Sequence, residues 1–170
     1  MKITTALFIF ALSITGAFSQ SFTAKTGGHC FTLELPEYLT KTWDLNDVAS
    51  LQYQNTMKDV YVVVIEDDKE QLESLGMKFT GPREFLDNFT KDYQKESKKR
   101  KLFEPSEFES NGNKLAQVEM SWKEDDIDFY MLITSVESPK HFYKILCWTT
   151  VQNSDKYMVD FKTIARSLKD

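Results

Sequence analysis

The chain has 170 residues, with 21 Lys and Arg against 26 Asp and Glu, and a net charge of −5 at pH 7. This length supports one self-sufficient core and argues against two domains. The acidic balance argues against nucleic acid as a partner, because phosphate binding needs a basic face.

The first 19 residues have the pattern of a secretory signal peptide. Lys2 supplies a positive start, an apolar run follows over 3–14, and small residues precede a cleavage point between Ser19 and Gln20. The run is shorter than the roughly 20 apolar residues of a membrane-spanning helix. We therefore expect export to the periplasm or the extracellular space, with no stable membrane anchor.

The remaining chain is predicted to contain a flexible leader over 20–28 and a single α+β domain over 29–170. Alternating apolar residues predict a first strand over 30–35, which Pro36 ends. Short strands follow over 42–45 and 49–53.

The residues over 60–65 are a continuous β-branched run, typical of a central strand covered on both faces. The segment 66–75 begins as a loop and turns helical. A longer helix is expected from Pro82 through Lys98, with an aromatic face that packs on a sheet. The basic run 98–101 would then be a solvated cluster at its C-terminal end.

An antiparallel meander follows. The Asn111-Gly112 pair is a strong hairpin signal, because a type I′ turn needs two positive φ angles. The strands of the meander are predicted over 103–110, 115–123, 127–137 and 142–151. A closing amphipathic helix is expected over 155–168, capped by Asn153 or Ser154.

Two cysteines, Cys30 and Cys147, leave two interpretations open. An oxidising compartment would allow one disulfide between them. Both also lie in apolar strand-like contexts, where free cysteine behaves as a small buried hydrophobe.

No catalytic constellation is recognisable. His29 and His141 are the two histidines, and Cys147 lies on the same strand face as His141 but about 20 Å away at strand rise. No G-x-S-x-G elbow occurs. We predict no catalytic residues, and a small exported hydrolase with an unrecognised site is the alternative.

No zinc pattern or phosphate loop occurs either, and no cofactor is predicted. Crowded carboxylates make Asp125, Asp126 and Asp128 weak candidates for Ca²⁺. The simpler interpretation is a charged hairpin tip that discourages aggregation. A Ca²⁺-stabilised envelope protein is a third hypothesis.

Large rings are numerous for a chain of this size, and they suggest binding. The candidate binding aromatics are Trp43, Trp122, Tyr143 and Trp148. Packing in a core between sheet and helices is the simpler interpretation.

The order of elements resembles the Mog1/PsbP-like group. The pattern F-x-L-x-x-P-x-x-L over 31–39 is followed by Trp43, short strands, the 60–65 strand, a helix, the meander with Asn111-Gly112, and a closing helix. The resemblance implies an antiparallel sheet flanked by helices, an α/β/α sandwich. It also implies a binding or assembly protein, with no specific partner-binding residue carried over.

The favoured function is therefore an exported, non-catalytic interaction module. Its partner would be a protein or a small apolar ligand, bound at a sheet or helix edge.

Overall fold

The computed structural model describes residues 20–28 and 31–170. The strands are β1 (Phe22–Gly27), β2 (Phe31–Pro36), β3 (Thr40–Lys41), β4 (Leu51–Asn55), β5 (Val60–Asp68), β6 (Lys98–Leu102), β7 (Ser106–Ser110), β8 (Asn113–Glu124), β9 (Ile127–Glu137) and β10 (His141–Thr150). The α-helices are α1 (Lys69–Ser74), α2 (Pro82–Asp92) and α3 (Ser154–Arg166).

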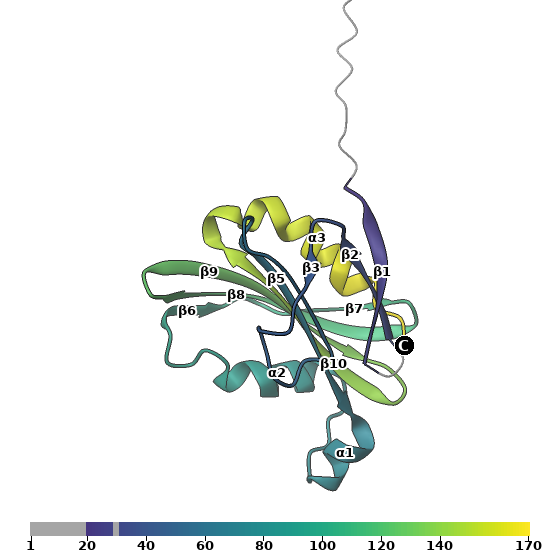
Figure 1. The fold of residues 1–170 in the computed structure, drawn as a ribbon. Coiled ribbons are helices and arrows are strands. Elements are labelled where there is room, and N and C mark those ends of the chain that lie inside the picture. The colour runs from purple at the N-terminus through teal and green to yellow at the C-terminus, as the bar shows by residue number, and fades with distance from the viewer. Residues whose placement is uncertain (1–19, 29–30) are drawn as a thin grey trace, which may run out of the picture.

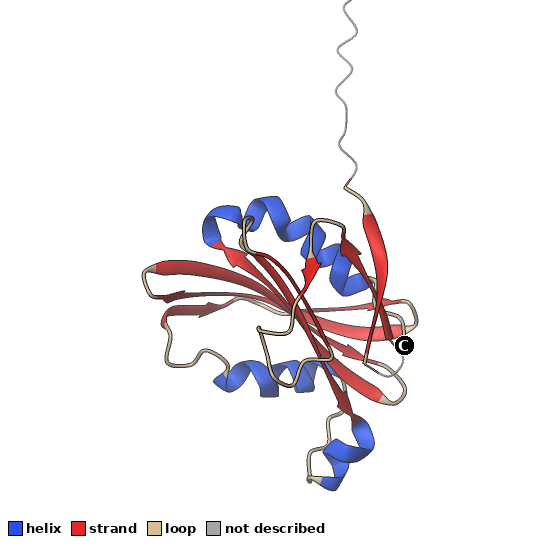
Figure 2. Cartoon of the chain, in the orientation of Figure 1, coloured by secondary structure: helices blue, strands red, loops and turns tan. Residues whose placement is uncertain are grey.

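The main sheet is antiparallel and has the strand order β3-β4-β5-β10-β9-β8-β6, while β7 pairs with the other end of β8. Strands β1 and β2 form a separate two-stranded sheet. Figure 2 shows how the long strands run together through the middle of the molecule.

Helices cover both faces of the main sheet (Figure 1). On one face, α3 and strand β2 enclose the core that contains Val62, Val64 and Phe161. On the other face, α2 packs on β8, β9 and β10 and encloses Val63 and Leu146. The predicted α+β sandwich is confirmed.

The predicted central strand is confirmed as β5, because consecutive residues over 62–65 are buried on alternating faces. The Asn111-Gly112 turn is also confirmed, with φ angles of 51° and 79°. No helix in the described ranges is long and apolar enough to cross a membrane.

The expected leader over 20–28 is instead largely strand β1, which pairs along its whole length with β2. The prediction of a flexible leader was wrong because the partners of this segment lie outside it. Its backbone pairs with β2, and Phe22 packs against the core. Pairing with that strand satisfies the backbone groups of the segment.

The long helix expected through Lys98 ends at Asp92, and the basic run forms strand β6. Tyr93 is extended and Gln94 has a φ of 55°, so the chain turns back toward the sheet. Arg100 then donates to the carbonyls of Thr90 and Tyr93, which satisfies the helix end.

The strand expected over 42–45 is a loop. The side chain of Gln52 accepts from the backbone N–H groups of Leu45 and Asn46 and donates to the Asn46 carbonyl. These bonds replace a strand ladder. Asn153 precedes α3 without a side-chain cap, because a short 3₁₀ turn over 151–153 leads into the helix.

Candidate binding pocket

His141 is surrounded by carboxylates. Its Nδ1 lies 3.3 Å from Oδ2 of Asp170, and its Nε2 lies 3.5 Å from Oε1 of Glu66 and 3.8 Å from Oδ2 of Asp68. Both ring nitrogens therefore face acidic oxygens.

Strand pairing places three of these residues together. His141 begins β10 and lies opposite Asp68 at the end of β5, and Tyr143 lies opposite Glu66. Residues two apart on a strand share a face, so the two carboxylates and the imidazole face the same side of the sheet.

The fourth residue, Asp170, is the last residue of the 170-residue sequence. Lys169 exchanges backbone hydrogen bonds with Thr32 of β2, at 2.8 and 3.0 Å. This bridge carries Asp170 to the ring of His141. Burial alone would raise the pKa of Asp170, but hydrogen bonds with Ser138, His141 and Tyr143 outweigh it and lower the pKa.

A pocket of about 470 Å³ opens beside the ring, with no Lys or Arg among its described lining residues. It is lined by Gly28, Ser50, Glu66, Asp68, Gln71 and His141. Gly28 has a φ of 55°, and a Cβ atom there would clash with Oε2 of Glu66. Glycine therefore allows the backbone to approach this carboxylate closely.

The pocket does not present a nucleophile to the imidazole in the described part of the chain. The hydroxyl of Ser50 donates to Glu66 at 3.4 Å, and that of Ser138 bonds to the backbone of His141. Cys147 is buried in the core, and burial raises the pKa of its thiol. His29 and Cys30 lie outside the described residues, so the Cys30–Cys147 disulfide stays a prediction.

The four candidate aromatics do not form one surface. Tyr143 is fully buried and Trp122 is 4% exposed, so both belong to the core. Trp148 is half-buried and stacks on Tyr61 with ring centroids 5.1 Å apart. Trp43 is 68% exposed, with the ammonium of Lys41 4.1 Å from its ring centroid.

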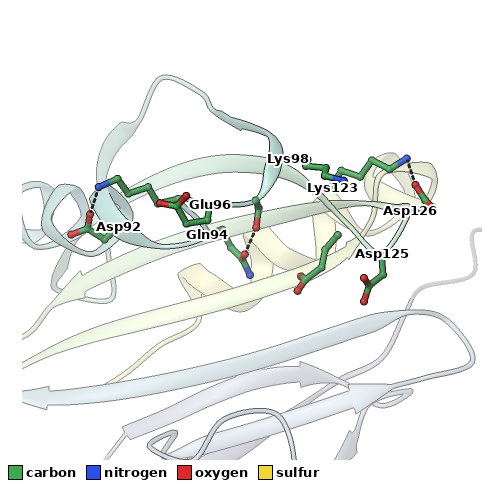
Figure 3. Close-up of a pocket in the computed structure, with 10 residues that line it drawn as sticks. Asp92, Gln94, Glu96, Lys98, Lys123, Asp125 and Asp126 are labelled. Carbon is green, nitrogen blue, oxygen red and sulfur yellow. Dashed lines mark hydrogen bonds and ion pairs between the residues drawn. The ribbon is translucent and has the colours of Figure 1, made fainter.

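The acidic hairpin forms part of a larger hollow of about 740 Å³. Figure 3 shows that acidic and basic side chains line it together, with Asp126 paired to Lys123 at 3.1 Å. Asp125 lines the same hollow, whereas Asp128 lines a different one. Among residues 20–28 and 31–170, no three His, Cys, Asp or Glu side chains are arranged to hold a metal ion.

In the sequence, Glu66 and Asp68 lie at the start of the 66–75 segment and His141 lies next to the predicted strand over 142–151, and they were not predicted to meet. Asp68 also caps α1, by accepting from the N–H of Gln71. The cluster depends on the register of β5 against β10, which no local pattern encodes. Nor does any local pattern indicate that Asp170 returns to the start of β10.

No protein-family model matches this sequence, and no curated protein matches it by sequence. Solved structures do match. Cyanobacterial PsbP (CyanoP) from Synechocystis sp. PCC 6803 has a TM-score of 0.63 and 13% identity, covering 92% of this chain and 96% of that one. LpqN from Mycobacterium tuberculosis, described as involved in cell envelope biogenesis, has a TM-score of 0.61 and 12% identity, covering 88% and 90%.

A third structure is PA94 from Pseudomonas aeruginosa, a putative regulator of unknown function. It has a TM-score of 0.53 and 13% identity, covering 88% of this chain and 96% of that one. These similarities show the fold alone. The chain has the fold of the Mog1/PsbP-like group, as the order of its elements predicts.

Proposed function

We propose that the chain is an exported, non-catalytic binding module. The observation that carries the proposal is the surroundings of His141, where both ring nitrogens face carboxylates. A hydrolase of the triad type needs its imidazole within hydrogen-bond reach of a nucleophile. The secretory pattern over 1–19 supports export, and LpqN, which shares the fold, is described as involved in cell envelope biogenesis.

The pockets favour a protein partner over a small apolar ligand. Two hollows in the described part of the chain, of about 740 and 470 Å³, are lined mostly by polar and charged residues. The hollow beside Phe79 and Phe142 encloses only about 170 Å³. Small-molecule sites usually enclose about 300–1,000 Å³, so this hollow fits a single side chain of a partner.

The exported hydrolase is the second candidate, because the His141–Asp170 contact resembles the orienting pair of a triad. The two functions separate in one comparison. Residues 20–170 are immobilised and exposed to extract from the native compartment, and any captured protein is displaced with free domain. In parallel, wild type and His141→Ala are screened on ester, peptide and glycoside substrates.

Reproducible, displaceable capture without turnover supports the binding module. Turnover by the wild type that His141→Ala abolishes would overturn it in favour of the hydrolase. Failure to capture any displaceable partner would also count against the proposal.

A further inference from the structure

We propose that the pocket beside His141 binds an organic cation, an alkylammonium or guanidinium group. The inference rests on the proposed function, since it names the chemical group that the binding module recognises.

The first support is the charge around the pocket. Glu66 and Asp68 line it, and Asp170 lies against the ring of His141. Two lysines close in sequence to the pocket residues direct their ammonium groups away from it, over the rings of Phe142 and Phe85. Lys69 pairs with Glu137 at 2.9 Å, and Lys144 pairs with Asp67 at 2.7 Å. The pocket therefore keeps an excess of acidic groups that an incoming cation can balance.

The second support is the burial of Glu66. Its side chain is only 8% exposed, yet its polar contacts within residues 20–28 and 31–170 are long, at 3.5 Å to His141 and 3.4 Å to Ser50. An ionised carboxylate has about four acceptor positions, and a buried charge is costly unless it is well hydrogen-bonded. A ligand N–H group would supply the short, charge-assisted bond that the described residues do not provide.

The third support is the shape of the pocket. Its volume of about 470 Å³ admits the end of an Arg or Lys side chain together with water. Ser50 and Gln71 add neutral polar groups at the wall. Several separated acceptors suit the fan of N–H donors that a guanidinium carries.

Calorimetric titration of residues 20–170 tests the proposal. The probes are the amidated, acetylated tripeptide Gly-Arg-Gly, the small molecule agmatine, and the matching Gly-Leu-Gly peptide. The wild type should bind the Arg peptide or agmatine saturably and should not bind the Leu peptide. Tighter binding of the peptide identifies a protein side chain as the source of the cation, and tighter binding of agmatine identifies a free organic cation.

Glu66→Gln should weaken binding on the order of tenfold or more, because it removes the charge but keeps the shape. Asp126→Asn is the matched control, since its carboxylate is 98% exposed at the hairpin and away from the pocket. If Glu66→Gln fails to fold, Asp68→Asn takes its place, because Asn also caps a helix.

Three results would overturn the inference: no binding of either cation, equal weakening in Glu66→Gln and Asp126→Asn, or binding of ZnCl₂ or CaCl₂ without binding of the organic cations. If the cations fail to bind while a displaceable protein is still captured from extract, this inference fails and the binding module stands.

Discussion

The Nδ1 atom of His141 lies 3.3 Å from the Oδ2 atom of Asp170, a residue 29 positions later in the chain. The contact joins the start of β10 to the segment that follows α3. It depends on the backbone bridge between Thr32 and Lys169. The candidate pocket is thus supported by both sheets and by the last residues of the chain.

Replacing Asp170 should destabilise the fold in a pH-dependent way. Asp170→Ala removes hydrogen bonds to a carboxylate, which we expect to cost about 1 kcal/mol near neutral pH after solvent screening. Because the folded-state pKa is lowered, this contribution is fully present above the unfolded value near 4. It is lost as the pH falls through the folded pKa.

Urea unfolding of wild type and Asp170→Ala from about pH 7 down to about pH 2.5 would measure this difference. Asp126→Ala, at the exposed hairpin, serves as the control. A difference that stays constant over the whole range would contradict the role assigned to Asp170.

Asp160 should show the opposite trend. Burial raises its pKa, and bonds with Tyr38 and Gln20 and the charge of Lys58 only partly offset this effect. The ionised carboxyl therefore reduces stability at neutral pH, and this penalty disappears as the pH falls through the folded pKa.

Asp160→Asn keeps an acceptor for the Tyr38 hydroxyl, which lies 3.0 Å from the carboxylate. We expect this variant to be at least as stable as wild type at pH 7. Asp160→Leu should be about 1–3 kcal/mol less stable, since the Tyr38 hydroxyl loses the carboxylate that accepts its hydrogen bond. Thermal unfolding compares the stability of wild type and the two variants. If Asp160→Asn were less stable than Asp160→Leu, this explanation would be refuted.

Helix α3 offers a matched pair of core and surface positions. Phe161 is fully buried against the sheet, whereas Val159 is 71% exposed. Phe161→Ala should lower the free energy of unfolding by about 3–5 kcal/mol, and Val159→Ala should change it by less than about 0.5 kcal/mol. Chemical denaturation measures both free-energy changes. Similar changes at the two positions would contradict the packing of α3 with Phe161 toward the sheet and Val159 toward solvent.

The thiol of Cys147 should resist alkylation in the folded protein. It is buried, and burial raises its pKa, so little reactive thiolate forms. Iodoacetamide should modify it in urea without a reductant, as intact mass would show. Modification that requires prior reduction would instead support the Cys30–Cys147 bridge.

Much of the fold could be predicted because local patterns carry it. Strand β9 is apolar on both alternating faces, and it lies between β8 and β10 with helices above and below. The end of α2 could not be predicted, since Tyr93 continues the helical spacing of Phe85 and Phe89. The carbonyl of Thr90 near the helix end accepts a hydrogen bond from Arg100, ten residues later in the chain.

The pocket could not be predicted for a related reason. Its lining residues come from the turn after β1, the segment before β4, strand β5, helix α1 and the start of β10. Strand register brings Glu66 and Asp68 to His141, and the Thr32–Lys169 bridge brings Asp170 to the same ring. The burial of the candidate aromatic residues could not be predicted either. Tyr143 and Trp43 are both large aromatic residues and both were candidates for binding, yet Tyr143 is fully buried and Trp43 is exposed.

An amide NMR titration of the isotope-labelled wild-type domain with the Arg tripeptide tests the account most directly. We predict saturable shifts centred on Gly28, Ser50, Glu66 and the start of β10, with little change at the acidic hairpin over 123–126. Shifts centred on that hairpin, or spread evenly over the acidic surface, would contradict the assignment of the pocket beside His141 as the binding site.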